Sequence, residues 1–360
     1  METEGTTQAL DAAADSEAWQ DVVSALPCEV QDVYFQPDYV SLDQTGADAR
    51  ALLFVHRRGE EVWACPFLLR PIPRIADASF SRELFDVETA YGYGGPVSTS
   101  DDADFLAESN RAFSQWLAAR GVVVEFIRLH PLLENQRWLA PEVEVIRDRE
   151  TVSMNLEKPV DAMTDYDGKA RNMVRRAERS GVRVIECPPL AGIRKFAELY
   201  EKTMDRLDAD AYYYLGEGYF RGLAGLAERS GWLLAAVRDD RWVAAAFFLR
   251  GANWLHYHLS ATDPDLRLPG ATNLILHAAA RLGRRRGLKR LHLGGGRTRA
   301  PDDPLLRFKR SMGSDSHAFC TGKRIVDPAD YARLRRLWEK QHPSLVPKFG
   351  DRVLFYRQRS

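Results

Sequence analysis

Pairs of strand-like segments joined by tight turns occur in both halves of the chain, and they constrain its fold more than any other feature. In the first half, the apolar run 51–56 is followed by a second run, 61–69, across Arg58-Gly59-Glu60. In the second half, the runs 232–237 and 242–249 are joined at Asp239-Asp240. Apolar runs separated by turn residues predict β-hairpins.

Segments with the apolar spacing of helices alternate with these strands. Hairpins mixed with helices indicate α/β (α+β) layers rather than a helical bundle. The length of 360 residues suits about two domains. We expect helices over 103–119, 168–180, 192–207, 218–229, 271–286 and 331–341, and further strands over 122–127, 254–260, 288–293 and 318–326.

Charge and cysteine usage argue against several classes of protein. The net charge of −1 gives no global sign of a nucleic-acid partner. The four cysteines lie far apart without CxxC spacing, so we expect no metal site and no disulfide framework, and we expect no cofactor. No apolar run reaches about 18 residues, so we expect no membrane span. The first residues do not resemble a signal peptide, and the expected location is cytoplasmic.

A glycine-rich segment near the C-terminus is the best candidate for chemistry. The strand over 288–293 runs into Gly294-Gly295-Gly296, and Asp303-Pro304 then begins a short helix that carries Phe308 and Lys309. Consecutive glycines let the backbone approach a ligand closely, and Arg297 and Lys309 add positive charge. A lysine in a cleft can stabilise a developing oxyanion. The alternative interpretation is that Lys309 is an exposed helix lysine and that the three glycines form an ordinary turn.

Several motifs, taken in order, resemble those of the FemAB-like proteins over about residues 30–345. Three of them form the C-terminal signature: Tyr257-His-Leu-Ser-Ala261, Leu291-His-Leu-Gly-Gly-Gly296 and Phe308-Lys-Arg-Ser-Met-Gly313. The basic segment 168–181 resembles the helix that opens the second domain of that family. Two more, Tyr91-Gly-Tyr-Gly-Gly-Pro96 and Arg128-Leu-His-Pro131, resemble first-domain motifs.

The resemblance implies two GNAT-like (acyl-CoA N-acyltransferase-type) domains. We expect an N-terminal domain over 1–160, joined by 328–360, and a C-terminal domain over 161–327. It also implies a transferase that moves an aminoacyl group from aminoacyl-tRNA to an amine or hydroxyl acceptor, such as a peptide, a cell-wall precursor or an antibiotic intermediate. In that reaction Lys309 would stabilise the ester carbonyl as it becomes tetrahedral, and Phe308 would pack beside the aminoacyl group.

His130 departs from the family pattern, because wall-peptide members tend to carry Asp before this proline. Its imidazole could act as a general base toward an ammonium acceptor, or it could cap the end of a strand. The departure puts the wall-precursor acceptor in doubt more than the reaction. The remaining candidates for substrate binding are Tyr91, Tyr93, Arg128, Tyr257, Gly295 and Arg297.

The basic helix presents a stripe of cations. Arg171, Arg175 and Arg179 are spaced four residues apart, with Lys169 beside them. The stripe could bind tRNA or other phosphates, or it could be a solvated helix face.

Two other functions remain open. An acyl-CoA-dependent N-acetyltransferase would need a pyrophosphate loop of the form [RQ]xxGx[GA]. The segment 267–272 matches only in part, because Thr272 replaces the last small residue and Pro269 removes one N–H. A non-catalytic binding module on the same fold is the other alternative.

Overall fold

The computed structural model describes residues 5–44, 49–73, 80, 82–209, 213–266 and 268–357. The chain divides into two compact units. Unit 1 comprises Met1–Val30, Tyr34–Arg147 and Cys320–Ser360, and unit 2 comprises Gln31–Val33 and Asp148–Phe319. These boundaries differ from the predicted 160/161 and 327/328 because the chain passes from one unit to the other within two strands, β7 (Glu144–Asn155) and β13 (Asp315–Ile325).

Unit 1 is a sheet with helices against it. Its strand order is β1-β2-β3-β4-β6-β13, with β5 paired to β3. The remaining strands are β1 (Thr6–Asp11), β2 (Arg50–Arg58), β3 (Glu61–Pro71), β4 (Phe85–Glu88), β5 (Val97–Ser98) and β6 (Val122–Arg128). The helices are α1 (Ser16–Ala25), α2 (Pro37–Leu42), α3 (Ala103–Ala119), α9 (Pro328–Gln341) and α10 (Val346–Phe349), with short 3-10 turns η2 (Asn135–Trp138) and η5 (Phe355–Arg357).

The predicted hairpin over 51–69 is confirmed, since β2 and β3 pair from Arg50↔Leu69 to Arg58↔Glu61. The chain start holds one element that the sequence did not predict. β1 pairs antiparallel with β2 from Thr6↔Arg57 to Asp11↔Leu52. Its side chains are mostly exposed, so it lacks the apolar alternation that identifies a strand.

Unit 2 is a second layered sheet, with the order β7-β12-β11-β10-β9-β8. Its other strands are β8 (Arg183–Cys187), β9 (Gly231–Arg238), β10 (Arg241–Arg250), β11 (Trp254–Thr262) and β12 (Arg290–Gly295). Its helices are α4 (Gly168–Arg179), α5 (Pro189–Arg206), α6 (Glu217–Ser230), α7 (Ala271–Arg285) and α8 (Pro304–Met312), and a 3-10 turn, η3, covers Val160–Ala162.

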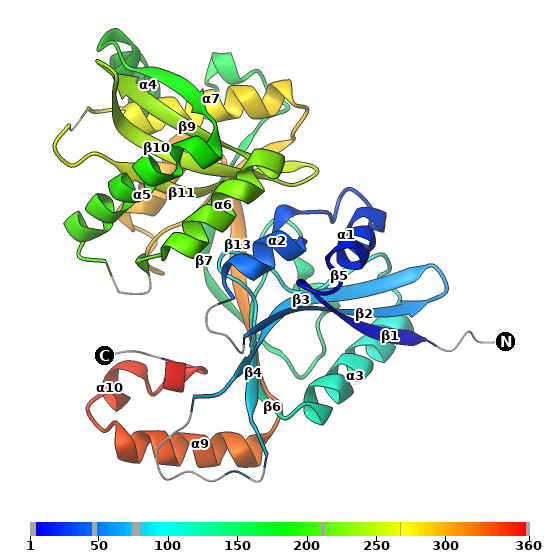
Figure 1. Ribbon diagram of the computed structural model, residues 1–360. Coiled ribbons are helices and arrows are strands. Elements are labelled where there is room, and N and C mark those ends of the chain that lie inside the picture. The colour runs from blue at the N-terminus through cyan, green and yellow to red at the C-terminus, as the bar shows by residue number, and fades with distance from the viewer. Residues whose placement is uncertain are drawn as a thin grey trace. The chain divides into compact units, whose positions relative to one another are not determined.

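Helices cover both faces of this second sheet. Figure 1 shows α4 and α7 on one side of β9 and β10, and α5 and α6 on the other. On the α4/α7 side, a single core joins these helices to α8 through buried side chains such as Val174, Leu276 and Met312. Phe308 packs against the same core. The α/β class predicted from the sequence is confirmed, and the packing fixes α8 against the strand that leads into it.

Candidate active site

The turn between β12 and α8 is held by one buried carboxylate. Asp303, 3% exposed, caps α8 by accepting hydrogen bonds from the N–H groups of Leu305 and Leu306 at 2.9 and 3.0 Å. Its other oxygen accepts from the N–H groups of Arg297 and Thr298. Burial alone would raise the pKa of Asp303, but these hydrogen bonds lower it to about 2. The carboxylate therefore stays charged and fixes the loop after the glycines.

Lys309 points into this fixed turn rather than into solvent. Its side chain is buried, and Nζ donates a hydrogen bond of 2.7 Å to the carbonyl oxygen of Gly295. Burial lowers the pKa of Lys309 to about 7, Asp303 opposes that shift, and Arg149 adds to it. The ammonium group thus has a neutral hydrogen-bond partner in a dehydrated place, where its charge acts strongly on nearby developing charge.

The glycine turn is also held from β7. Gly294 has a φ of +74°, a left-handed conformation that favours glycine. Arg149 donates from Nη1 to the carbonyl oxygens of Gly296 and Arg297 at 3.1 and 3.3 Å. The side chain of Arg297 itself is exposed, and its backbone N–H donates a hydrogen bond to Asp303. Arg149 was not predicted, because nothing in its sequence context marks it.

Tyr257 lies in unit 2 on β11. It is half-buried, its ring centroid is 5.6 Å from that of Phe248, and it packs on the same core as Phe308. Burial raises the pKa of Tyr257 to about 12, so its hydroxyl stays protonated. Five predicted site residues therefore belong to unit 2 and surround one turn or its core: Tyr257, Gly295, Arg297, Phe308 and Lys309.

The predicted residues of unit 1 form a cluster of their own. A parallel bridge between Gly94 and Leu129 brings the 91–96 turn beside the 128–131 segment. His130 is fully buried, with its ring 5.9 Å from that of Tyr93 and 6.0 Å from that of Tyr34. Its backbone N–H donates to Oδ1 of Asn135 at 2.9 Å.

Arg128 and Tyr91 have strong structural partners in that cluster. Arg128 donates from Nη2 to Glu88 at 2.6 Å and from Nη1 to the Thr89 carbonyl oxygen at 2.9 Å. The N–H of Tyr91 donates to Asp43 at 3.0 Å. These contacts explain how the turn and the strand end are positioned.

The cationic stripe on α4 is largely exposed. Lys169, Arg175 and Arg179 are exposed, and Arg171 is half-buried with its guanidinium donating to the carbonyl oxygen of Tyr166. The start of α4 is joined to α8 by a hydrogen bond. The N–H of Asp167, the N-cap residue of α4, donates to the carbonyl oxygen of Ser311 at 2.9 Å. The stripe thus leads away from the helix that carries Lys309.

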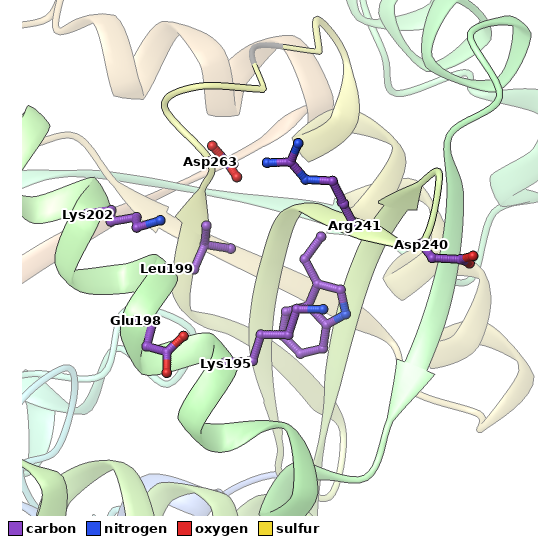
Figure 2. A pocket seen from close by; sticks show the side chains of 8 residues that line it. Lys195, Glu198, Leu199, Lys202, Asp240, Arg241 and Asp263 are labelled. Atoms are coloured by element: carbon purple, nitrogen blue, oxygen red, sulfur yellow. The ribbon is translucent and has the colours of Figure 1, made fainter.

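A separate surface pocket of about 180 Å³ lies in unit 2, and it contains no predicted site residue. Figure 2 shows its lining, which comes from α5, β10 and the adjoining turns. Lys195 lies 4.8 Å over the ring of Trp242 there. Its lining is Lys195, Glu198, Leu199, Lys202, Asp240, Arg241, Trp242 and Asp263. The side chains around this open pocket carry charges of both signs, and none of them is a predicted site residue. We therefore place the chemistry at the β12–α8 turn instead.

Residues 167–310 match the family described as Acetyltransferase (GNAT) domain, and this range ends just after Lys309. A search of curated proteins finds no match.

Solved structures share the fold over most of the chain. FemX superposes with a TM-score of 0.69 at 13% identity, covering 91% of this chain and 99% of its own. The C-terminal domain (DUF2156) of a putative lysylphosphatidylglycerol synthetase from Agrobacterium fabrum gives 0.54 at 11% identity, covering 93% and 97%. A tandem GNAT protein from the clavulanic acid biosynthesis pathway gives 0.52 at 10% identity, covering 90% and 99%.

The class that these findings support is a transferase: residues 167–310 match a GNAT acetyltransferase domain, and the fold resembles that of FemX. The predicted enzyme class and the predicted resemblance are therefore confirmed. Among the described residues, no helix is long and apolar enough to span a membrane.

Proposed function

We propose that this chain transfers an aminoacyl group from aminoacyl-tRNA to an amine, with the reaction centred on Lys309. The observation that carries the proposal is the buried Lys309 ammonium, which donates a hydrogen bond to the neutral Gly295 carbonyl. Such a group can exchange that bond for one to a substrate oxygen. The FemAB-like motifs support an aminoacyl donor, and a cytoplasmic location belongs to the same proposal.

The chemistry follows from charge. The amine attacks the ester carbon, and the carbonyl oxygen becomes an oxyanion that Lys309 stabilises. The C–O bond to the tRNA ribose then breaks, and the leaving oxygen needs a proton. A donor with a pKa of about 7 suits this step at neutral pH, so Lys309 can also supply that proton and regain one from the attacking nitrogen as the amide forms. An aminoacyl ester is already activated, and no covalent enzyme intermediate is required.

The other proposed site residues have supporting roles. Phe308 lies beside Lys309 on α8 and offers an apolar surface to the aminoacyl side chain. The α4 stripe Lys169, Arg171, Arg175 and Arg179 would hold tRNA phosphates, since it starts where α4 meets α8. His130 would act as a general base toward the acceptor, and Tyr91, Tyr93 and Arg128 would bind substrate.

A direct test uses bulk tRNA charged with ¹⁴C-labelled amino acids and hydroxylamine as a small acceptor. The proposal expects enzyme-dependent formation of labelled hydroxamate from tRNA and none from labelled acetyl-CoA.

The second candidate is transfer from acetyl-CoA. It is supported by the GNAT domain match and by the likeness to a tandem GNAT protein. In the partial pyrophosphate motif, Arg267 lies outside the described residues, and Gly270, with a φ of +91°, is the N-cap of α7. Labelled product from acetyl-CoA alone would favour this function over the first.

A further inference from the structure

The backbone pairing of β7 with β12 stops at the candidate site. Its last cross-strand pair is Gly295↔Thr151, and the residues of β7 just before Thr151 are Asp148-Arg149-Glu150. Because the two strands are antiparallel, this charged segment runs alongside the loop that follows Gly295. Side-chain contacts therefore hold the loop where the backbone ladder ends.

Arg149 contacts three consecutive residues of the glycine turn. Its Nη1 donates to the carbonyl oxygens of Gly296 and Arg297 at 3.1 and 3.3 Å. Its aliphatic stem lies against Gly295, since a Cβ at Gly295 would be 3.2 Å from Cδ of Arg149. The carbonyl oxygen of Gly295 is the one that accepts from Nζ of Lys309. Arg149 thus fixes the peptide that orients the ammonium group.

The two acids beside Arg149 hold it and the loop in place. Asp148, whose side chain is 8% exposed, accepts from Nε of Arg149 through one oxygen and from Nε of Arg299 through the other, the latter at 2.8 Å. Glu150 accepts from Nε and Nη2 of Arg310 on α8, both at 2.8 Å. Bonds between ionised groups are strong and directional, so the guanidinium of Arg149 has a fixed orientation.

Arg149 also brings a positive charge close enough to act on Lys309. Burial lowers the pKa of Lys309 most, Asp303 in the loop before α8 raises it, and Arg149 on β7 lowers it further. Without the charge of Arg149, the ammonium group would hold its proton more tightly. Transfer of that proton to a leaving oxygen would then be harder at neutral pH.

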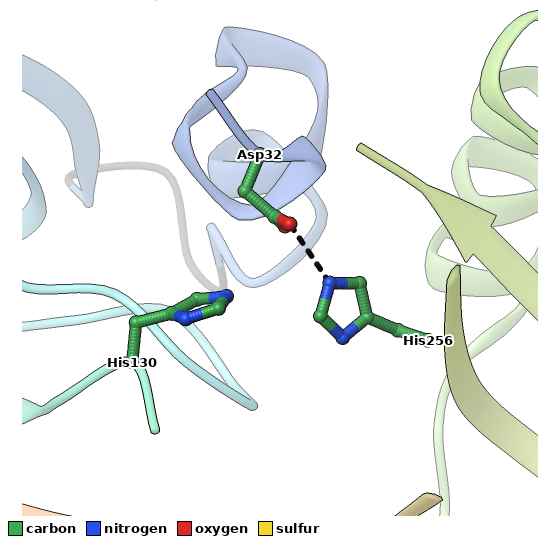
Figure 3. Close-up of side chains that lie close together, drawn as sticks. All are labelled: Asp32, His130 and His256. Atoms are coloured by element: carbon green, nitrogen blue, oxygen red, sulfur yellow. Dashed lines mark hydrogen bonds and ion pairs between the residues drawn. The ribbon is translucent and has the colours of Figure 1, made fainter. Parts of the chain in front are cut away.

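Another acid–base pair of unit 2 lies further from the turn. Oδ2 of Asp32 lies 2.8 Å from Nε2 of His256, as Figure 3 shows, and both residues are at most 2% exposed. His256 is level with His292 on β12. At about 3.3 Å per residue, Gly295 is roughly 10 Å further along the strand. This pair belongs to the interior of the sheet, and the residues beside the turn act on Lys309.

We propose that Arg149 is a positioning residue for the transfer reaction: it fixes the peptide that orients Lys309 and holds a second positive charge close to the ammonium group. The proposal rests on the proposed aminoacyl transfer. Arg149 acts through Lys309 rather than on the substrate. Its carbonyl contacts keep Nζ aligned while the ester carbonyl becomes tetrahedral. Its charge favours release of the Lys309 proton to the leaving ribose oxygen, and Lys309 regains a proton from the attacking nitrogen as the amide forms.

Two substitutions separate the contacts of Arg149 from its charge. Arg149→Lys keeps the charge but lacks the planar fork that reaches two carbonyls, and Arg149→Met keeps an apolar stem but loses both. With charged tRNA as donor and hydroxylamine as acceptor, kcat should fall by about 10-fold in Arg149→Lys and by about 100-fold in Arg149→Met. KM for charged tRNA should stay within about threefold of the wild-type value, because Arg149 does not bind the donor.

Arg147→Met is the matched control, since it removes an exposed cation from the same strand. Its kcat and KM should both stay close to those of the wild type. A wild-type kcat in Arg149→Met, or a loss confined to KM, would overturn the proposal.

The pH profile distinguishes a charge effect from a loss of structure. Transfer by the wild type should decline as pH rises through about 7, where Lys309 loses its proton. Loss of the Arg149 charge raises the pKa of Lys309, so the decline should move to higher pH in Arg149→Met and stay in place in Arg149→Lys. A slow Arg149→Met enzyme with the wild-type pH profile would show a merely structural role and overturn the proposal.

A second measurement does not depend on the reaction. ¹⁵N NMR of lysine-labelled protein can follow the titration of Nζ of Lys309, whose signal is identified by its absence in Lys309→Met. The pKa should be about 7 in the wild type and higher in Arg149→Met. The same pKa in both proteins would overturn the proposal. If the pKa moves as expected but the wild type transfers no aminoacyl group, the proposed function fails, and the part of Arg149 in that reaction fails with it.

Discussion

Nζ of Lys309 donates a 2.7 Å hydrogen bond to the carbonyl oxygen of Gly295, which joins the α8 helix to the end of β12. The bond crosses a turn that Asp303 and Arg149 hold from two sides. It places a dehydrated cation at a strand end where the backbone is mostly glycine. The local sequence thus builds a charge-stabilising position before any substrate binds.

The first prediction concerns pH and stability. The pKa of Lys309 is lowered from 10.5 to about 7 in the folded protein. Between these values the unfolded chain binds the extra proton, so the free energy of unfolding should rise with pH across this window. Below about pH 7 both states are protonated and the unfavourable burial of charge is fully present. Lys309→Met, followed by denaturant unfolding, should lack this rise; an identical pH slope in the variant would contradict the assignment.

The rate of transfer should depend on the same protonation of Lys309. If the ammonium form stabilises the oxyanion, transfer to hydroxylamine should decline as pH rises through about 7, because hydroxylamine itself gains no further reactivity from deprotonation there. The measurement is the initial rate of hydroxamate formation from charged tRNA. A rate that rises steadily through pH 9 would indicate that the neutral amine is the active form.

Asp303 should stabilise both the helix and the turn. Asp303→Ala removes an N-cap and should destabilise the protein by about 1–2 kcal/mol. Asp303→Asn keeps an acceptor oxygen and should cost less. Because the pKa of Asp303 is lowered to about 2, its contribution is present above its ordinary value of 3.8 and lost as pH falls toward 2. Thermal unfolding of both variants between pH 2 and 6 checks this, and equal effects of Ala and Asn would refute the capping role.

A methyl group at Gly295 should disturb the reaction more than the fold. A Cβ at this position would lie 2.7 Å from the backbone oxygen of Glu150, so the strand end must shift. Misplacement of about 1 Å can lower a rate by about 100-fold, and Gly295→Ala should approach that loss. Gly225→Ala is the matched control, since a Cβ at Gly225 meets nothing within 4 Å. A Gly295→Ala enzyme with wild-type kcat would contradict the placement of the site.

The α4 stripe should act on tRNA alone. Arg175→Glu and Arg179→Glu should raise KM for charged tRNA, and each lost phosphate contact should reduce the slope of log affinity against log salt by about one. Transfer from a short aminoacyl ester, such as an aminoacyl-adenosine, should be unaffected. Arg194→Glu, at a side chain 93% exposed on α5, is the control for charge reversal. Equal changes in all three variants would point to a general charge effect.

The sequence predicts well those elements that have a regular apolar pattern. The hairpin β9–β10 and the helix α3 lie within a few residues of their expected positions. β8 was not predicted, because Arg183, Ile185 and Glu186 are exposed and leave no alternation of buried positions. The same holds for much of β7, whose buried side chains begin only at Thr151.

The residues around the candidate site also differ in how far the sequence could predict them. Lys309, Phe308 and Gly295 are contiguous in sequence with a capped helix start, so local rules could find them. Arg149 lies on β7, far from Gly296 in the sequence, and no spacing rule connects the two. Its place beside the turn follows only once the register of β7 and β12 is known.

The most direct test of the account is the rate at which Lys309→Met transfers labelled aminoacyl groups from tRNA to hydroxylamine. We predict a loss of about 100- to 1,000-fold in kcat, the range for removing one oxyanion donor, with no loss of thermal stability. Lys309→Arg should retain partial activity because it keeps the charge. Turnover by Lys309→Met at the wild-type rate would contradict the central role of this lysine.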